Sequence, residues 1–148
     1  MRYREGQAGL AMVEFAIVLP LMMLLILGVT ELGRAFMQYN TLTKAVRDGA
    51  RHLAAYSLYA GAVRIDAQRA AEARNLVVYG NSAGNGSPVL QNLSPAQVTV
   101  SDVGGGQVRI DVSYPYQPLT GPTLPNFGLG SSTPLAFTMQ ASVTMRAL

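Results

Sequence analysis

The chain of 148 residues has no cysteine, no tryptophan and only one histidine, His52. Without cysteine it forms no disulfide, no thiolate metal site and no cysteine nucleophile. Charged residues are also scarce: they make up 13% of the sequence, well below the roughly 25% of ordinary soluble domains. The 11 basic residues, all arginine except Lys44, form no block of like charge. The composition therefore predicts no nucleic-acid partner and supplies few catalytic groups.

Hydrophobic residues, in contrast, make up 49% of the chain and are concentrated near its N-terminus. The run from Leu10 to Val29 contains one charged residue, Glu14. A helix over this run is about 30 Å long, the thickness of the hydrocarbon core of a bilayer. A secretory signal peptide is the nearest alternative, but its apolar region is usually only about 7–15 residues long. We therefore predict a retained transmembrane helix over residues 10–30.

Two residues are unusual in such a run. Pro20 has no backbone N–H and its ring crowds the preceding turn, so it predicts a kink in the helix. The carboxylate of Glu14 costs on the order of 2.5–3.5 kcal/mol at the centre of a bilayer and less near its surface. Glu14 therefore either lies near the interface or pairs with a positive group of another molecule.

The charges beside the run give a weak indication of its orientation. Arg2 and Arg4 precede it, whereas Arg34, Lys44 and Arg47 follow it at a comparable distance. The count of basic residues does not decide between the two orientations. The tight cluster at the N-terminus favours a cytoplasmic N-terminus and an extracytoplasmic C-terminal head.

A short motif stands where the basic leader, residues 1–9, meets the apolar run. Glu14 is the fifth residue after Gly9, and Phe15 follows it. This arrangement resembles the prepilin-peptidase site of type IV pilins and their Tad/Flp relatives. From Gly9 to about Ala54 the chain is similar to the TadE-like family of minor pilins and pseudopilins. The most specific parts of the resemblance are the strings VEFAIVLP, ELGRA and VRDGAR.

The resemblance implies that a prepilin peptidase cuts between Gly9 and Leu10. It also implies that Glu14, with Phe15 beside it, sets the register between subunits by pairing with the new amino group of a neighbour. The protein would then be a non-enzymatic minor pilin or pseudopilin that takes part in assembling a Tad-type (Flp) pilus, a system of tight adherence and secretion. Its partners would be the lipid bilayer, the prepilin peptidase, other pilins and Tad assembly proteins.

The same expectation includes no cofactor, no metal, no nucleic acid and no small-molecule substrate. The protein would sit in the inner membrane by a single pass, with a periplasmic head, or would enter a pilus. The alternative is an uncleaved, inner-membrane-tethered periplasmic binding or scaffold protein. The mature N-terminus distinguishes the two hypotheses.

Beyond the run, helical periodicity continues through an amphipathic extension over residues 31–60. We expect one helix from about Leu10 to Tyr56, with Gly61 as a stop. Its polar residues alternate with an apolar stripe that needs a partner. The predicted stripe consists of Leu32, Phe36, Tyr39, Thr43, Val46, Ala50 and Leu53.

Residues 61–148 predict an α+β head. A second, short helix is expected from Arg64 to about Leu76, with Asp66 in its first turn. The composition of residues 80–88 and 117–134 predicts loops. Alternating residues predict an antiparallel sheet of about three strands that packs against the first helix.

The expected strands are residues 97–103, 108–116 and 135–146. A glycine turn at 104–106 joins the first two, and Pro115 should end its ladder or lie at an edge. In the last strand one face is expected to carry Leu135, Phe137, Met139, Ala141, Val143 and Met145.

The remaining candidates for chemistry are weak. Ser82 lies in a G-x-S-x-G string, but that motif needs a preceding strand, a following helix and a later histidine. His52 comes earlier in the chain and, as a lone histidine, is expected at the surface rather than on a metal. Asp102 and Asp111 flank the predicted hairpin, where solvated carboxylates are ordinary. We therefore expect no active site.

Overall fold

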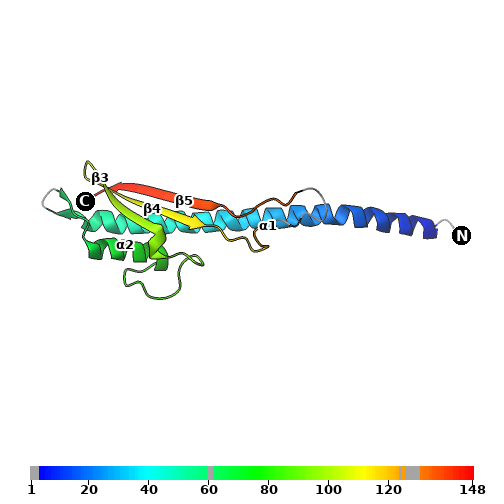
Figure 1. Cartoon of the computed structure of the whole chain (residues 1–148), viewed down its shortest axis with the longest axis horizontal. Coiled ribbons are helices and arrows are strands. Elements are labelled where there is room, and N and C mark those ends of the chain that lie inside the picture. The colour runs from blue at the N-terminus through cyan, green and yellow to red at the C-terminus, as the bar shows by residue number, and fades with distance from the viewer. Residues whose placement is uncertain (1–3, 60–61, 124, 126–130) are drawn as a thin grey trace. The chain divides into compact units, whose positions relative to one another are not determined.

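The computed structural model describes residues 4–59, 62–123, 125 and 131–148, with side chains from residue 9 onward. The predicted α+β class is confirmed: a long helix, a short helix and small antiparallel sheets follow one another along the chain (Figure 1). The elements are α1 (Arg4–Tyr56), β1 (Leu58–Tyr59), β2 (Ala62–Val63), α2 (Ala67–Tyr79), the 3-10 helix η1 (Pro95–Gln97), β3 (Val98–Gly104), β4 (Gln107–Pro115) and β5 (Thr138–Arg146).

The chain divides into two compact units, which are described separately. The first, called the anchor unit, contains Met1–Ala35 and Gln117–Ala136. The second, called the head unit, contains Phe36–Tyr116 and Phe137–Leu148.

Helix α1 ends at Tyr56 as predicted, but it begins at Arg4 rather than near Leu10. The additional residues include alanine and glutamine, which favour helix, so residues 4–9 of the leader continue the same ladder. Gly61, the predicted stop, lies outside the described residues. The chain instead leaves α1 through a small antiparallel hairpin of β1 and β2, which the sequence analysis did not predict.

Helix α2 begins and ends about three residues later than predicted. Asp66 lies before the helix as its N-cap, and its Oδ1 accepts a hydrogen bond of 2.7 Å from the backbone N–H of Arg69. At the other end Gly80 adopts φ 71°, and its N–H donates to the carbonyl of Leu76 at 3.0 Å. Glycine adopts this left-handed conformation without a Cβ clash. The two capping residues, Asp66 and Gly80, therefore mark the ends of α2 better than the composition of the segment does.

The three-stranded sheet has the order β3-β4-β5, and both pairs are antiparallel. The predicted turn is present, because Gly104, Gly105 and Gly106 all have positive φ. In the central strand β4, alternate side chains are buried, as predicted. Pro115 ends this strand, as expected for a residue that cannot donate to a ladder.

Both ends of β3 and β4 differ from the prediction by one residue, and the start of β5 differs by three. Strand β3 begins at Val98 because Gln97 belongs to η1, where its Oε1 accepts a 2.8 Å hydrogen bond from the N–H of Ser94. Strand β5 begins at Thr138 rather than Leu135, because its partner β4 ends opposite it at Pro115. Within β5 the predicted alternation holds: Met139 and Ala141 are buried.

The buried face of α1 differs from the predicted stripe. Val46, Ala50 and Leu53 are buried as predicted. Leu32 and Phe36, however, are 57% and 60% exposed. The face that is buried in their place is formed by small and aliphatic side chains at Ala35, Leu42, Ala45, Val46, Gly49, Ala50, Leu53 and Ala54.

Gly49 shows why this face packs closely within the head unit. A Cβ added there would lie 2.6 Å from Cγ2 of Val77 and 3.1 Å from the carbonyl oxygen of Ala73, both on α2. It would also lie 3.4 Å from Cδ1 of Ile110 on β4. In Figure 1, α2 runs beside the C-terminal part of α1. The glycine of the VRDGAR string therefore allows α1 to approach both α2 and the sheet.

The anchor unit pairs the N-terminal part of α1 with the excursion between β4 and β5. Glu31, directly after the apolar run, is only 5% exposed. Its carboxylate accepts hydrogen bonds from Leu119 and Thr120, 88 and 89 residues along the chain. The predicted loop at 117–134 is thus partly attached to the helix.

Candidate functional site

The predicted processing motif lies entirely on α1. Gly9 and Leu10 are exposed and helical, and so are Glu14 and Phe15. A Cβ added at Gly9 would have no atom of the described structure within 4 Å. An added side chain at Gly9 therefore meets open space apart from its own helix, so we expect a substitution there to leave the fold intact.

Pro20, the fifth predicted residue, is half-buried and lies inside α1, which continues through it. A proline at this position cannot donate to the carbonyl four residues earlier. The kink that this implies stays a prediction.

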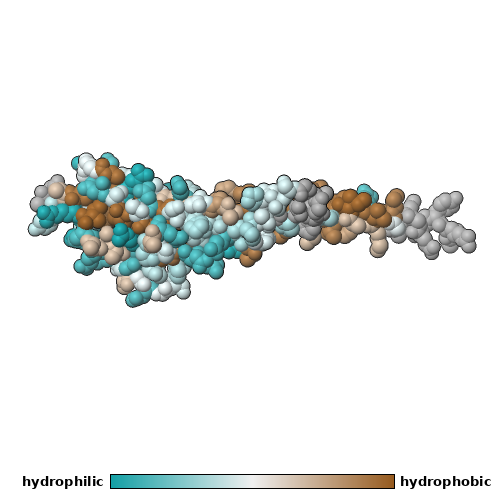
Figure 2. Space-filling view, in the orientation of Figure 1, coloured by the Kyte–Doolittle hydropathy of each residue, from teal (hydrophilic) through white to brown (hydrophobic). Residues whose placement is uncertain are grey.

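The apolar run forms a surface rather than a core. Its most hydrophobic window has a mean hydropathy of 2.6, and none of that window is buried within the chain. By length and composition this helix can cross a membrane. Hydrophobic side chains colour the N-terminal part of α1 brown on the face seen in Figure 2. The strongly exposed ones include Leu10, Met12, Val13, Phe15, Ile17, Leu21, Leu25, Ile26 and Val29.

An exposed surface of this kind is stable only against lipid or another apolar surface. The run therefore indicates a membrane anchor. Glu14 is the one ionisable side chain among residues 10–29, and it is exposed. A carboxylate at such a place needs a partner from outside this chain or access to water.

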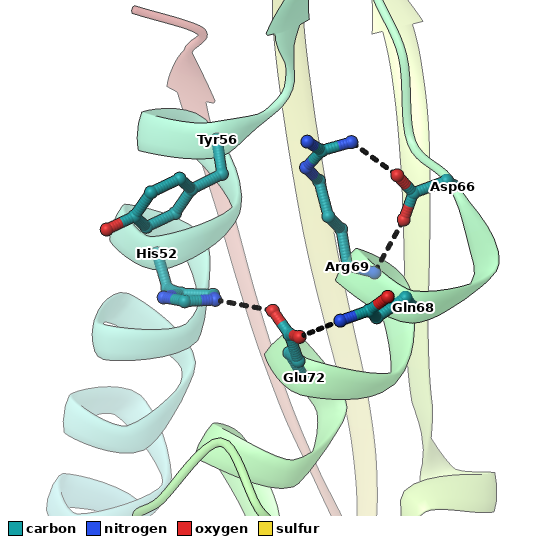
Figure 3. Close-up of a pocket in the computed structure, with 6 residues that line it drawn as sticks. All are labelled: His52, Tyr56, Asp66, Gln68, Arg69 and Glu72. Carbon is teal, nitrogen blue, oxygen red and sulfur yellow. Dashed lines mark hydrogen bonds and ion pairs between the residues drawn. The ribbon is translucent and has the colours of Figure 1, made fainter.

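A polar cluster joins the two helices of the head unit. Nε2 of His52 on α1 lies 3.3 Å from Oε2 of Glu72 on α2. The other oxygen of Glu72 accepts a 2.9 Å hydrogen bond from Nε2 of Gln68. The ring of His52 also lies 4.9 Å from that of Tyr56, and the guanidinium of Arg69 pairs with the Asp66 carboxylate (Figure 3).

These groups line an open hollow of about 220 Å³. Each carboxylate in it already accepts hydrogen bonds from a neighbour, and no serine, threonine, cysteine or lysine lies among the lining residues. Among the residues that the structure describes, no three His, Asp or Glu side chains gather to hold a metal. His52 was expected at the surface, and the structure shows it partly buried, as a partner of Glu72 that joins α1 to α2.

Acid should weaken this junction through Glu72. The hydrogen bonds from Gln68 and then His52 hold the pKa of Glu72 below its ordinary value of 4.5. Because the folded pKa is the lower one, the stabilising contribution is complete above pH 4.5 and is lost as the pH falls through the folded pKa. We expect Glu72→Gln to lower the thermal midpoint at neutral pH, and the difference from wild type to shrink in acid. Thermal unfolding between about pH 3 and pH 7 measures this difference.

Asn81→Ala, on the loop that follows α2, is a matched control. Asn81 makes hydrogen bonds that involve no ionisable group, because its partners are the backbones of Tyr79 and Asn85. The effect of this change should therefore be independent of pH. A Glu72→Gln difference that stays constant across the same range would contradict the assignment.

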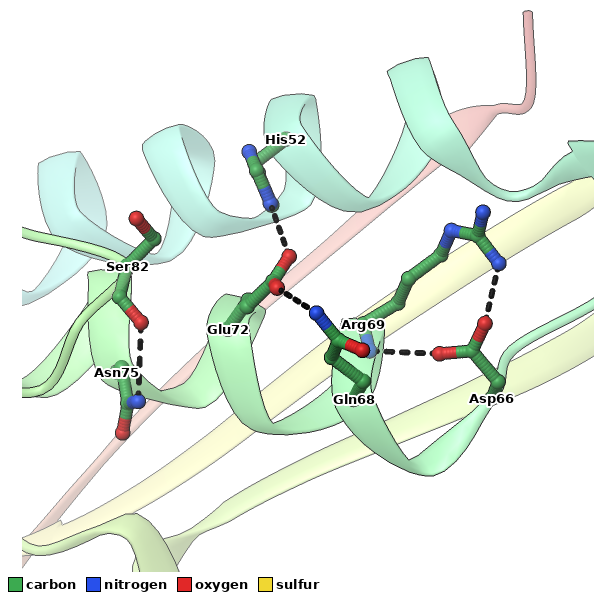
Figure 4. A network of polar contacts seen from close by, with 7 residues as sticks. All are labelled: His52, Asp66, Gln68, Arg69, Glu72, Asn75 and Ser82. Atoms are coloured by element: carbon green, nitrogen blue, oxygen red, sulfur yellow. Dashed lines mark hydrogen bonds and ion pairs between the residues drawn. The ribbon is translucent and has the colours of Figure 1, made fainter.

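The G-x-S-x-G string does not form a nucleophile elbow. Ser82 follows α2 rather than a strand, and the residues after it form turns rather than a helix. The backbone carbonyl of Ser82 accepts a 3.1 Å hydrogen bond from Nδ2 of Asn75, which fastens the loop to α2 (Figure 4). Ser82 therefore has a structural setting and not that of an activated serine.

The two hairpin aspartates are also engaged locally. Oδ1 of Asp102 accepts a 2.8 Å hydrogen bond from the N–H of Gly104, at the irregular end of β3. Oδ1 of Asp111 lies 2.9 Å from Nε of Arg109, a neighbour on the same face of β4. Both serve the sheet and its turn.

Sequence analysis missed Glu31 and Gly49, although both lie in strings that it singled out. The signal for Glu31 was a carboxylate directly after an apolar run, but its partners lie in a distant loop. The signal for Gly49 was a glycine in the interior of a helix, which costs about 1 kcal/mol relative to alanine and needs a compensating reason. In both cases the reason is a tertiary contact.

Comparison with known proteins agrees with the resemblance found in the sequence. Residues 9–51 match the family model described as TadE-like protein. No curated protein and no solved structure matches the chain. The matched segment contains the apolar run, Glu14, Glu31 and Gly49, and the family implies a protein associated with a Tad-type pilus. The chain is thus similar to TadE-like proteins over residues 9–51, the segment that includes its membrane-length helix.

Proposed function

We propose that this chain is a minor pilin or pseudopilin of a Tad-type (Flp) pilus, cut after Gly9 by a prepilin peptidase and assembled through its N-terminal helix. One observation carries the proposal. A helix of membrane length in the family-matched segment exposes apolar side chains along its course, with a single carboxylate five residues after a glycine. A helix that served only as a tether needs no such carboxylate, which lipid disfavours.

The surroundings of Gly9 suit a cleavage site. Glycine makes a helix less stable than alanine does by about 1 kcal/mol, so α1 opens more easily there. The absence of a side chain also lets an enzyme approach the backbone closely. The cut produces a positively charged amino group on Leu10, four residues before Glu14.

Helix pairing would then supply the assembly contacts. In a membrane the lipid provides little hydrophobic drive between helices, so packing and polar pairs decide which helices associate. Glu14 of one subunit and the amino group of Leu10 on its neighbour form such a pair. We place the protein in the inner membrane, with a cytoplasmic N-terminus and a periplasmic head. The proposed partners are the prepilin peptidase, other pilins or minor pilins and Tad assembly proteins.

The mature N-terminus tests the proposal. The full chain is produced in cells with and without a Tad prepilin peptidase, and the membrane fraction is analysed by N-terminal sequencing. We expect a chain that starts at Leu10 only when the peptidase is present. Gly9→Val places a branched side chain beside the scissile bond, so we expect this variant to remain uncut.

Gly33→Val is the matched control. Gly33 is another glycine of α1 with no atom within 4 Å of an added Cβ, so this variant makes a similar change in the same helix away from the cut. We expect it to be cleaved like the wild type. If the wild type keeps Met1 in the presence of an active peptidase, the proposal is wrong and the uncleaved tether takes its place.

A further inference from the structure

The carboxylate of Glu31 bonds a distant loop to α1 at the end of the apolar run. Oε1 of Glu31 accepts hydrogen bonds from the N–H of Leu119 at 2.8 Å and from the N–H of Thr120 at 2.9 Å. It also accepts one from the Oγ1 hydroxyl of Thr120 at 3.0 Å. Bonds to an ionised acceptor are stronger than those between neutral groups. Glu31 therefore fixes the position of residues 119–120 along the helix.

The described part of the loop that is attached in this way, residues 117–123, 125 and 131–136, is called the strap. The backbone N–H of Leu135 donates to the carbonyl of Pro122 at 2.9 Å, and Thr123 forms an isolated bridge with Pro134. The outgoing and returning limbs of the strap are thus joined. Figure 1 shows the described residues of this segment beside α1. Glu31 therefore positions a connected structure and not only a single loose turn.

The attachment point coincides with the end of the proposed membrane span. Glu31 follows Val29 by two residues, which places it about 3 Å farther along a helix. The half-buried residues of the apolar run, Pro20, Leu24, Leu27 and Gly28, have the spacing of the helix face that carries Glu31. This face of the apolar run is therefore less exposed than the rest of the run.

Leu119 is an exposed apolar residue at this attachment point. Its side chain is 70% exposed, although its own N–H is held by Glu31. Val29, at the end of the run, is 71% exposed. A leucine held at the level of a bilayer surface gains free energy by entering the interface. Irregular backbone is tolerated near lipid only where its polar groups are already bonded, and Glu31 satisfies two N–H groups and one hydroxyl of the strap.

We infer that the strap contacts the lipid–water interface at the C-terminal end of the apolar run, with Leu119 inserted among the lipid headgroups and Glu31 as the residue that positions it. The inference rests on the proposed membrane anchoring of α1. A second copy of the chain on the same surface is the competing occupant. Lipid is favoured because the hydrogen bonds to Glu31 hold Leu119 at the end of the apolar run.

The absence of cysteine makes a direct test possible, because Leu119→Cys creates a unique labelling site in the full chain. Glu31 accepts its hydrogen bond from the backbone N–H of Leu119, so a substitution of the side chain preserves that bond. The labelled protein carries the fluorophore NBD and is reconstituted into phosphatidylcholine–phosphatidylglycerol vesicles. Nitroxide lipids labelled in the headgroup, or deep in the acyl chain, then quench emission according to depth.

Two further single-cysteine proteins calibrate the depth. Val18→Cys lies within the apolar run and should be quenched most by the deep nitroxide. Ser87→Cys lies in an exposed loop of the head unit and reports a position in water. We expect the label at residue 119 to be quenched by the headgroup nitroxide. Adding Glu31→Ala should reduce that quenching to the Ser87 level and leave the Val18 signal unchanged, whereas Glu31→Gln, which keeps an acceptor oxygen, should reduce it less.

The outcomes separate the inference from the proposed anchor. Quenching at residue 18 without quenching at residue 119 overturns the strap contact and leaves the anchor in place. Loss of quenching at both positions overturns both. If the label at residue 119 is unquenched and the unlabelled Leu119→Cys protein, treated with an added thiol oxidant in the same vesicles, forms disulfide-linked dimers, the surface belongs to a second copy and the lipid assignment is wrong.

Discussion

Replacing Leu42 with alanine is expected to lower the free energy of unfolding of the head unit by about 2–5 kcal/mol. The same change at Leu32, on the same helix, is expected to alter stability by less than about 0.5 kcal/mol. The side chain of Leu42 is 0% exposed, so its truncation leaves a cavity between α1 and its neighbours, whereas Leu32 is 57% exposed. The two substitutions are chemically identical, which makes burial the only difference between them.

Unfolding of the full chain in detergent micelles measures the loss of stability in the Leu42→Ala and Leu32→Ala variants. Near-ultraviolet circular dichroism follows the tyrosines, and Tyr114 is 1% exposed with its hydroxyl donating to the carbonyl of Gln91 at 2.9 Å. This signal reports on packing in the head rather than on the membrane helix. If Leu32→Ala were costly and Leu42→Ala neutral, the buried face of α1 would be the stripe expected from the sequence.

Glu14→Gln is expected to lower association with partner pilins by about 100-fold or more, because breaking an ion pair in a low-dielectric setting costs about 3–5 kcal/mol. Glutamine keeps the size and polarity of the side chain and removes only its charge. In the proposed assembly it leaves the amino group of a neighbouring Leu10 without its counter-charge. Cross-linking of the chain to pilins in cells that carry the Tad system measures the loss.

A double variant identifies the partner of Glu14. Gly9→Val is expected to prevent the cut and therefore the formation of the charged amino group on Leu10. In that background Glu14→Gln should cause little further loss, because the two changes remove the two members of one pair. Additive losses would show that Glu14 pairs with a different group. Glu14→Asp, which keeps the charge on a shorter side chain, should retain more association than Glu14→Gln.

The elements of this fold were largely predictable because each has a local signal. The apolar run of residues 10–29 predicts a long helix by its length alone. The alternation around Ile110 predicts a half-buried strand, and Gly104–Gly106 predicts the turn before it. The ends of α2 were misplaced because composition was weighed above its caps, although Asp66 and Gly80 were both visible in the sequence.

The stripe on α1 shows where the local signal fails. Leu32, Phe36 and Tyr39 have the spacing of a buried face, but they are exposed in this chain. Periodicity identifies an apolar surface without showing what covers it. The surface that the head buries instead includes alanines and Gly49, which are weakly hydrophobic but allow close approach of α2. Packing geometry, rather than hydrophobicity, selected that face.

The sequence by itself determined the membrane-length helix, the single carboxylate within it and the α+β class, because these depend on neighbours within a few turns or along one strand. Only the tertiary structure decided that Glu31 holds residues 119 and 120, that His52 meets Glu72 and that Gly49 faces Val77. Each of these contacts joins residues 20 or more positions apart. The free energy of such a contact depends on where the whole chain brings its backbone, and that is not written in any local pattern.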